Sequence, residues 1–159
     1  KDIGEHKLHL QAVLQVLQQQ ELNVNKKKCN WAQQSLEYLG HLISGKGVES
    51  DPSKLAAMSK WPIPKDIKSL RGFLGLTGYY RRFVKDYGKW AQPLNALLKK
   101  DAFKWTGEAE KSFEKLKEVM SELPVLMVPD FSKPFVLETD ASRVGLGAVL
   151  LQEGRPLAV

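Results

Sequence analysis

The sequence predicts an α+β protein in which helices occupy the middle of the chain and antiparallel strands end it. Two changes in spacing carry this prediction. Between residues 51 and 123, apolar residues recur every three or four positions, which is the period of an amphipathic helix. After Pro124 they recur at every second position, which is the period of a strand. With 43% hydrophobic residues among 159, the chain can also form a packed core.

The first fifty residues are predicted to form one helix and several strands. The helix covers about residues 5–22, and residues 24–31 are predicted as a strand with basic residues near its start. Residues 35–44 are predicted as a further strand. Glycines mark a turn at residues 45–47, after which residues 48–49 can pair back on that strand.

Helices are predicted next. The first begins with Asp51 as the N-cap and Pro52 in the first helical position. It must stop near Pro62, because the residue before a proline disfavours helical geometry. A second helix begins at Asp66, and a short third helix holds the apolar residues of 90–98.

The last helix and the terminal sheet complete the prediction. Thr106 can cap a helix that Pro124 ends. Residues 135–140, 146–152 and 155–159 then alternate as three strands.

The helix predicted over residues 66–83 presents two different faces. One face is apolar and is expected to pack on a core, whereas the other combines two glycines with basic side chains. Because a glycine inside a helix costs roughly 1 kcal/mol against alanine, two on one face indicate a close approach to the backbone. Both a nucleic-acid strand and a second helix packed on the glycines fit this pattern. The apolar face consists of Ile67, Leu70, Phe73, Leu74, Thr77, Tyr80 and Val84, and the opposite face of Lys68, Gly72, Gly75, Leu76, Tyr79 and Phe83, flanked by Arg71 and Arg82.

Positive charge is concentrated in the same part of the chain. Residues 53–104 contain 12 Lys and Arg against 3 Asp and Glu, a net charge of +9, whereas the whole chain carries +6. Residues 1–52 are neutral and residues 105–159 carry −3. A confined basic segment favours nucleic-acid binding, and a solvated basic face without a partner is the alternative.

The composition also excludes several classes. A single cysteine, Cys29, excludes an internal disulfide and fits a reducing compartment. No run approaches the ~18 apolar residues of a membrane span, and the charged start does not resemble a secretory signal. A structural zinc site is not expected, because the other candidate ligands are only His6, His9 and His41 and no Cys-X-X-Cys pair exists.

Short motifs follow one another along nearly the whole chain. They are Glu5-His6 with His9-Leu10, Lys28-Cys29, Tyr38-Leu39-Gly40-His41, Asp51-Pro52-Ser53-Lys54, Trp61-Pro62-Ile63-Pro64, Leu70-Arg71-Gly72-Phe73-Leu74-Gly75-Leu76 with Gly78-Tyr79-Tyr80-Arg81-Arg82-Phe83, Pro124-Val125-Leu126 with Pro129-Asp130, and Thr139-Asp140-Ala141-Ser142 running to Gly145-Leu146-Gly147-Ala148-Val149-Leu150. Each is weak alone. In this order they resemble the Pol polyprotein of gypsy-type long-terminal-repeat retrotransposons.

The resemblance covers the second half of the reverse transcriptase and the first strands of its ribonuclease H domain. It implies that residues 1–50 are the end of the palm subdomain with a primer-grip hairpin. Residues 51–104 would be the basic, helical thumb and residues 105–123 a connecting helix. Residues 124–159 would be the truncated start of a ribonuclease H-like domain.

The resemblance implies nucleic-acid contacts in two segments. Tyr38 to His41 resemble the primer grip, whose backbone holds the end of the growing strand, although a hairpin with a glycine bulge is a simpler interpretation. In the thumb helix, Lys68, Gly72 and Leu76 match positions that follow the minor groove of the duplex. The residues predicted to contact nucleic acid are Leu39, Gly40, His41, Lys68, Arg71, Gly72, Gly75, Leu76, Tyr79 and Arg82.

The catalytic carboxylates that the family requires are incomplete here. The Tyr-X-Asp-Asp turn of the polymerase would precede Lys1, and no two of the seven Asp are adjacent. Ribonuclease H uses two metal ions held by about four acidic ligands, of which only Asp140 is present. Glu138 shares its strand face and is interpreted as incidental, and a turn-capping role is the alternative for Asp140. Asp140 is thus predicted as a catalytic metal ligand, with Mg²⁺ acting in the complete enzyme and not expected to bind this fragment tightly.

We therefore expect a fragment of an RNA-directed DNA polymerase with ribonuclease H activity, which grips and positions the primer–template duplex. The implied partners are RNA–DNA hybrid, duplex DNA and the remainder of the Pol polyprotein, with no membrane. The implied location is intracellular, in the cytoplasm or in virus-like particles, and not secreted. The alternative is a retrotransposon-derived, non-catalytic module that binds nucleic acid or protein.

Overall fold

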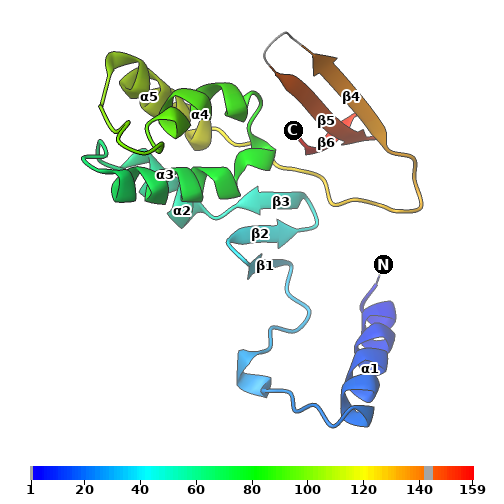
Figure 1. Cartoon of the computed structure of the whole chain (residues 1–159). Coiled ribbons are helices and arrows are strands. Elements are labelled where there is room, and N and C mark those ends of the chain that lie inside the picture. Colours follow the sequence, from blue (N-terminus) through cyan, green and yellow to red (C-terminus); the bar gives the residue numbers. More distant parts are fainter. Residues whose placement is uncertain (1, 142–144) are drawn as a thin grey trace. The chain divides into compact units, whose positions relative to one another are not determined.

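The computed structural model describes residues 2–141 and 145–159 (Figure 1). The chain divides into two compact units, Lys1–Leu36 and Glu37–Val159. The fold is α+β, with helices and two small antiparallel sheets, as the spacing of apolar residues predicts. No helix among the described residues is long and apolar enough to cross a membrane.

The first unit contains helix α1 (Ile3–Gln19), whose first turn is capped by the Asp2 side chain. None of the α1 residues is buried. The prediction of a strand over residues 24–31 is wrong, because the 3₁₀ helix η1 (Lys26–Lys28) forms there instead. The physical reason is local, because the Asn25 side chain accepts a hydrogen bond from the Lys27 amide and closes a turn.

The single strand predicted over residues 35–44 is two strands, β1 (Ser35–Tyr38) and β2 (His41–Ser44). Leu39 and Gly40 separate them with φ values of 48° and 72°, as in the two-residue type I′ turn of a hairpin. The connection is therefore a tight turn in which both central residues have a positive φ. β3 (Gly47–Ser50) pairs back on β2, so the first sheet has the order β1-β2-β3.

Four helices follow, and three of them begin at the predicted caps. Asp51, Asp66 and Thr106 each accept a hydrogen bond from a backbone amide of the first turn. The helices are α2 (Pro52–Ser59), α3 (Ile67–Tyr79), α4 (Tyr87–Ala96) and α5 (Gly107–Ser121).

Helix α3 is shorter than predicted. It ends at Tyr79, and the chain continues in the 3₁₀ helix η2 (Arg81–Phe83). The change of helix type rotates Phe83 into the core, where it is buried. Phe83 therefore does not belong to the exposed face on which the sequence pattern placed it.

Two hydrophobic clusters hold the helices together. The first joins α3, α4 and α5 and centres on Phe73 and Phe113, whose ring centroids are 4.5 Å apart. The second lies around Tyr80 and Phe83 and also contains Met120 of α5 and Leu126. Because α5 contributes to both clusters, the segment that was expected to connect two domains is part of the helical core.

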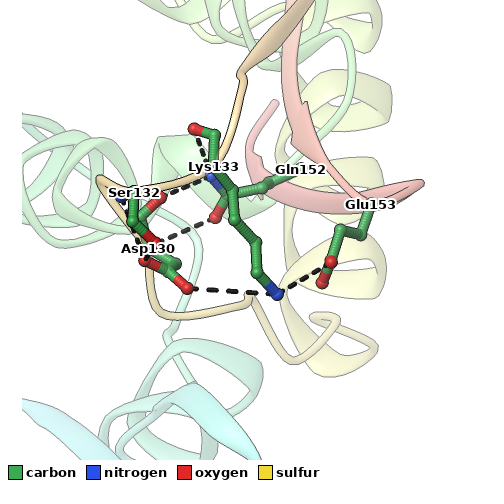
Figure 2. Close-up of polar contacts among 5 residues, drawn as sticks. All are labelled: Asp130, Ser132, Lys133, Gln152 and Glu153. Carbon is green, nitrogen blue, oxygen red and sulfur yellow. Dashed lines mark hydrogen bonds and ion pairs between the residues drawn. The ribbon is translucent and has the colours of Figure 1, made fainter.

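The second sheet has the order β4-β5-β6, formed by β4 (Val136–Ala141), β5 (Leu146–Gln152) and β6 (Arg155–Ala158). These bounds agree with the predicted strands. The side chain of Gln152 is buried and holds the loop that precedes β4, as Figure 2 shows. Its Oε1 accepts a hydrogen bond from the Asp130 amide at 2.8 Å, and its Nε2 donates one to the Asp130 carbonyl at 2.7 Å. Lys133 adds an ion pair to Glu153 at 2.8 Å.

A short extended segment connects the two sheets. Val48 of β3 exchanges two backbone hydrogen bonds with Leu126, at 2.7 and 3.0 Å. The next residue, Met127, donates its amide to the Pro156 carbonyl of β6 at 2.9 Å. Backbone hydrogen bonds therefore run from the first hairpin through residues 126–127 to the C-terminal sheet.

Candidate nucleic-acid interface

Helix α3 divides its side chains as the sequence pattern predicts. Leu70, Phe73, Leu74 and Thr77 are buried in the core. The opposite face is open to solvent and includes two cations and both glycines. Its exposed members are Lys68, Arg71, Gly72, Gly75 and Tyr79, and Leu76 is half-buried.

The two glycines on the exposed face of α3 have different surroundings. A Cβ built on Gly75 would meet nothing within 4 Å, whereas one on Gly72 would lie 3.3 Å from the indole of Trp61. Trp61 belongs to the loop before α3 and also contacts the Phe73 ring, with centroids 6.0 Å apart. The group beside Gly72 is therefore a loop tryptophan and not a second helix, and Gly75 is the glycine that leaves the helix backbone accessible.

The β1–β2 turn lies against the C-terminal end of α3. The Tyr79 hydroxyl donates to the Leu39 carbonyl, and the Tyr80 hydroxyl donates to the Gly40 carbonyl at 2.7 Å. A Cβ on Gly40 would lie 3.1 Å from the Tyr80 hydroxyl oxygen, and its φ is in the left-handed region. Glycine is therefore required at position 40 by the turn and by the tyrosine packed on it.

His41 lies at the centre of an aromatic cluster beside this turn. Its ring stacks on Tyr79 with centroids 5.2 Å apart and an interplanar angle of 15°, and it meets the edge of Tyr80 at 5.5 Å. The Arg82 guanidinium lies 3.2 Å from His41 Nε2. Burial, and secondly the charge of Arg82, lower the pKa of His41 below its ordinary value. The neutral imidazole can then accept a hydrogen bond from Arg82, and this bond holds the guanidinium beside the turn.

The predicted residues thus form two adjoining groups. Leu39, Gly40, His41 and Arg82 surround the turn, and the remaining residues lie along the exposed face of α3. Tyr79 belongs to both groups, because it is the last residue of α3 and its hydroxyl binds Leu39. Exposed cations beside an accessible backbone can bind phosphates without reading a sequence.

Two residues of this site were missed by sequence reasoning. Tyr80 was assigned only to the core, yet its hydroxyl binds the turn, and Trp61 was treated only as a helix stop. The consecutive tyrosines after Gly78 were the available signal for Tyr80. No local signal indicates that Trp61 packs beside Gly72.

The predicted metal ligand lies elsewhere, on β4. Asp140 is exposed and pairs with Gly147 of β5, and Glu138 lies two residues before it. Among the described residues, no three side chains of the His, Cys, Asp and Glu types come together as a metal site. The donor set in residues 2–141 and 145–159 therefore does not fit a complete two-metal centre. Ser142 of the family motif lies outside these described residues.

Comparison with known proteins identifies relatives over the whole chain. The RNase H-like domain found in reverse transcriptase matches residues 105–158. The uncharacterized mitochondrial protein AtMg00860 of Arabidopsis thaliana is 55% identical over 80% of this chain and 82% of its own length. The retrovirus-related Pol polyproteins from the Drosophila melanogaster transposons 297 and gypsy are 41% and 38% identical over 98% of this chain. The chain spans only 15% and 16% of their lengths.

Solved structures show the same fold. The foamy viral protease-reverse transcriptase dRH in complex with double-stranded DNA is 23% identical, with a TM-score of 0.86 over 99% of this chain and 29% of that one. The foamy viral protease-reverse transcriptase in complex with RNA/DNA hybrid is 24% identical, with a TM-score of 0.84 over 99% of this chain and 22% of that one. The chain therefore belongs to the family of retrovirus-related Pol polyproteins of retrotransposons such as gypsy and 297, and it corresponds to a reverse transcriptase segment that runs into the RNase H-like domain.

Proposed function

We propose that this segment grips and positions the primer–template duplex of an RNA-directed DNA polymerase that also has ribonuclease H activity. The observation that carries the proposal is the joining of the β1–β2 turn to the exposed face of α3 through Tyr79. Together they form a surface with accessible backbone at Gly75 and cations on either side. The Pol relatives and the nucleic-acid complexes of the foamy viral protein support the same role.

The charges indicate how such a surface would bind. Lys68 and Arg71 lie exposed in the first turns of α3, and Arg82 lies exposed beyond its end. Cations spaced along one helix can contact successive phosphates, while Gly75 lets the edge of a groove come close. Binding of this kind is largely independent of sequence and weakens with salt.

The functional division follows from this assignment. We assign the palm end with its primer grip to residues 1–50, the thumb to residues 51–104, a connecting helix to residues 105–123 and the start of the ribonuclease H-like domain to residues 124–159. The role of α5 in both helical clusters supports a connecting helix that is fixed to the thumb. We also propose that the protein acts inside the cell.

For the C-terminal sheet we propose a narrower role. Asp140 would supply one oxygen ligand for a divalent metal, Mg²⁺ in the complete enzyme, and ligands from outside the described residues would complete the set. A lone carboxylate leaves Mg²⁺ mostly hydrated, so this chain alone would cleave no RNA. In the complete protein, Asp140→Asn would abolish hybrid cleavage and leave DNA synthesis largely intact.

Salt-dependent binding to a labelled DNA duplex and to an RNA–DNA hybrid tests the proposal. We expect weak binding by the wild-type chain. The slope of log K against log salt should become shallower by roughly 0.9 on duplex DNA for each phosphate that a variant no longer neutralises. Lys68→Ala and Arg71→Ala should each reduce that slope. The matched control is Lys111→Ala, an exposed lysine of α5. Binding that does not respond to salt, or an equal reduction from Lys111→Ala, would refute the role of α3.

One observation favours a second candidate, a non-catalytic interaction module derived from a retrotransposon. The match to AtMg00860 covers 80% of this chain and 82% of that protein, so a relative exists that is about as long as this segment. Reading the gene on both sides of the segment separates the two candidates. A Tyr-X-Asp-Asp turn upstream and further acidic ligands downstream would favour the enzyme, and their absence from the gene would favour the module.

A further inference from the structure

We propose that Tyr80, together with Tyr79, is a positioning residue that fixes the β1–β2 turn to the end of α3, so that turn and helix bind a duplex as one surface. This inference rests on the proposed function. It assigns to Tyr80 a role that differs from its place in the hydrophobic core. It also assigns to Tyr79 a bond to the protein itself in addition to a contact with nucleic acid.

The geometry is a double clamp on two consecutive carbonyls. Tyr79 donates its hydroxyl to the Leu39 carbonyl, and Tyr80 donates its hydroxyl to the Gly40 carbonyl at 2.7 Å. Leu39 and Gly40 are the two central residues of the turn. Because both peptide groups are held, the turn cannot rotate without breaking a hydrogen bond to α3.

The strength of this clamp comes from how its parts are buried. Tyr80 is only 1% exposed, and its ring packs at right angles on Tyr79 with centroids 5.0 Å apart. Burial is also the main cause that raises the pKa of Tyr80, which keeps its hydroxyl protonated as a donor. The Gly40 carbonyl also accepts the Asp51 amide at 3.2 Å, so the turn is connected to the start of α2 as well.

The turn has reason to need such support. Leu39 has a φ of 48°, a conformation that non-glycine residues rarely adopt, and its side chain is 70% exposed. A strained residue persists only where its surroundings hold it in place. The tyrosine clamp supplies that constraint and leaves the Leu39 side chain free to contact a ligand.

Removal of single hydroxyls tests the clamp without removing any ring. In the 159-residue chain, Tyr80→Phe and Tyr79→Phe each remove one hydrogen bond to the turn. Tyr87→Phe is the matched control, because the Tyr87 hydroxyl bonds Thr77 on α3 at 3.0 Å and does not touch the turn. The first measurement needs no ligand: exchange of the Asp51 amide, which donates to the clamped Gly40 carbonyl, should become roughly three- to tenfold faster in Tyr80→Phe than in the control.

The second measurement is a double-mutant cycle on binding to a fluorescein-labelled DNA duplex. Leu39→Ala keeps a Cβ, and therefore the same backbone, but removes the side chain at the turn. We expect it to weaken binding in the wild type and to have little effect once Tyr80→Phe has released the turn. Lys68→Ala should instead act equally in both backgrounds, because Lys68 lies several turns away on α3.

The two measurements separate the clamp from the proposed function. Exchange of the Asp51 amide that is no faster in Tyr80→Phe than in Tyr87→Phe would overturn the clamp, whatever the chain binds. Additive effects of Leu39→Ala and Tyr80→Phe would also overturn it. If exchange rises as expected but the wild-type chain shows no salt-dependent binding to duplex, the clamp stands as a structural feature, and both the proposed function and the joint binding surface fail.

Discussion

Helices α1 and α3 have similar sequence patterns but different environments. Both carry apolar residues at a spacing of three and four, and both begin with an aspartate cap. Four side chains of α3 are buried, whereas α1 buries none over its 17 residues. The difference shows that a helical period predicts where apolar residues will lie on a helix, while burial depends on a partner that the period does not specify. Most of the stability of a helix in a protein comes from such packing.

The same substitution in the two helices gives the largest expected contrast. Leu70→Ala in α3 removes a fully buried side chain and should lower the free energy of unfolding by roughly 2–5 kcal/mol. Leu14→Ala in α1 changes a side chain that is 38% exposed and should change that free energy by less than about 0.5 kcal/mol. Urea unfolding followed by circular dichroism measures both values. Similar decreases at the two positions would mean that α1 is packed as tightly as α3.

A second contrast concerns the two glycines of the β2–β3 connection. Gly47 has a φ of 142°, and an added Cβ would lie 2.2 Å from the Leu126 carbonyl oxygen. Gly47→Ala should therefore break the bridge between Val48 and Leu126 and cost roughly 2–4 kcal/mol. Gly45→Ala is the control, because a Cβ there would meet nothing within 4 Å.

Thermal melts of the two glycine variants give the measurement. If Gly47→Ala had the same melting temperature as Gly45→Ala, residues 126–127 would not bind β3 closely. Breaking the bridge should also raise hydrogen exchange at the Leu126 amide, which donates to the Val48 carbonyl at 3.0 Å.

These contrasts also explain what the sequence could predict. The caps at Asp51, Asp66 and Thr106 and the alternation of β4 to β6 are local signals, and the structure has the predicted elements there. Spacing alone did not predict the split between β1 and β2, because Leu39 carries no turn signature although it adopts a positive φ. The resemblance did imply a hairpin at Tyr38 to His41, where the strands separate. The strand predicted over residues 24–31 failed because a side-chain cap at Asn25 outweighed β propensity.

The candidate site divides in the same way. The exposed face of α3 followed from spacing alone, because a helix places residues three and four apart on one side. The Tyr80 hydroxyl bonds a turn that lies 40 residues earlier in the sequence. The Trp61 indole packs beside Gly72 from the loop that precedes α3. No local pattern reports such contacts, so they became visible only in the folded chain.

The exposed face of α3 offers a smaller contrast between its two glycines. At position 75 a Cβ meets no neighbouring atom within 4 Å, and leucine forms helix better than glycine. Gly75→Leu should therefore raise the free energy of unfolding by up to about 1 kcal/mol and weaken duplex binding. Gly72→Leu must displace the Trp61 indole and should instead destabilise the chain by roughly 1 kcal/mol or more.

Melting curves and binding curves together decide the glycine prediction. Unchanged affinity in a stable Gly75→Leu protein would exclude a close approach of nucleic acid to α3. Gly88→Leu is a useful control, because Gly88 is an exposed glycine of α4 with nothing within 4 Å of its Cβ position.

The smallest expected effect is a pH dependence centred on His41. Burial and Arg82 lower its pKa in the folded chain, so the unfolded chain binds the proton more readily. The stability that His41 contributes should be complete above its ordinary pKa of about 6.5 and should decline as the pH falls toward the lower, folded pKa. Urea unfolding at about pH 7.5 and about pH 5.5 should therefore show a larger decrease in stability for the wild type than for His41→Gln. Equal decreases in the two proteins would mean that His41 is protonated as easily in the folded chain as in water, and that the aromatic cluster does not shield it.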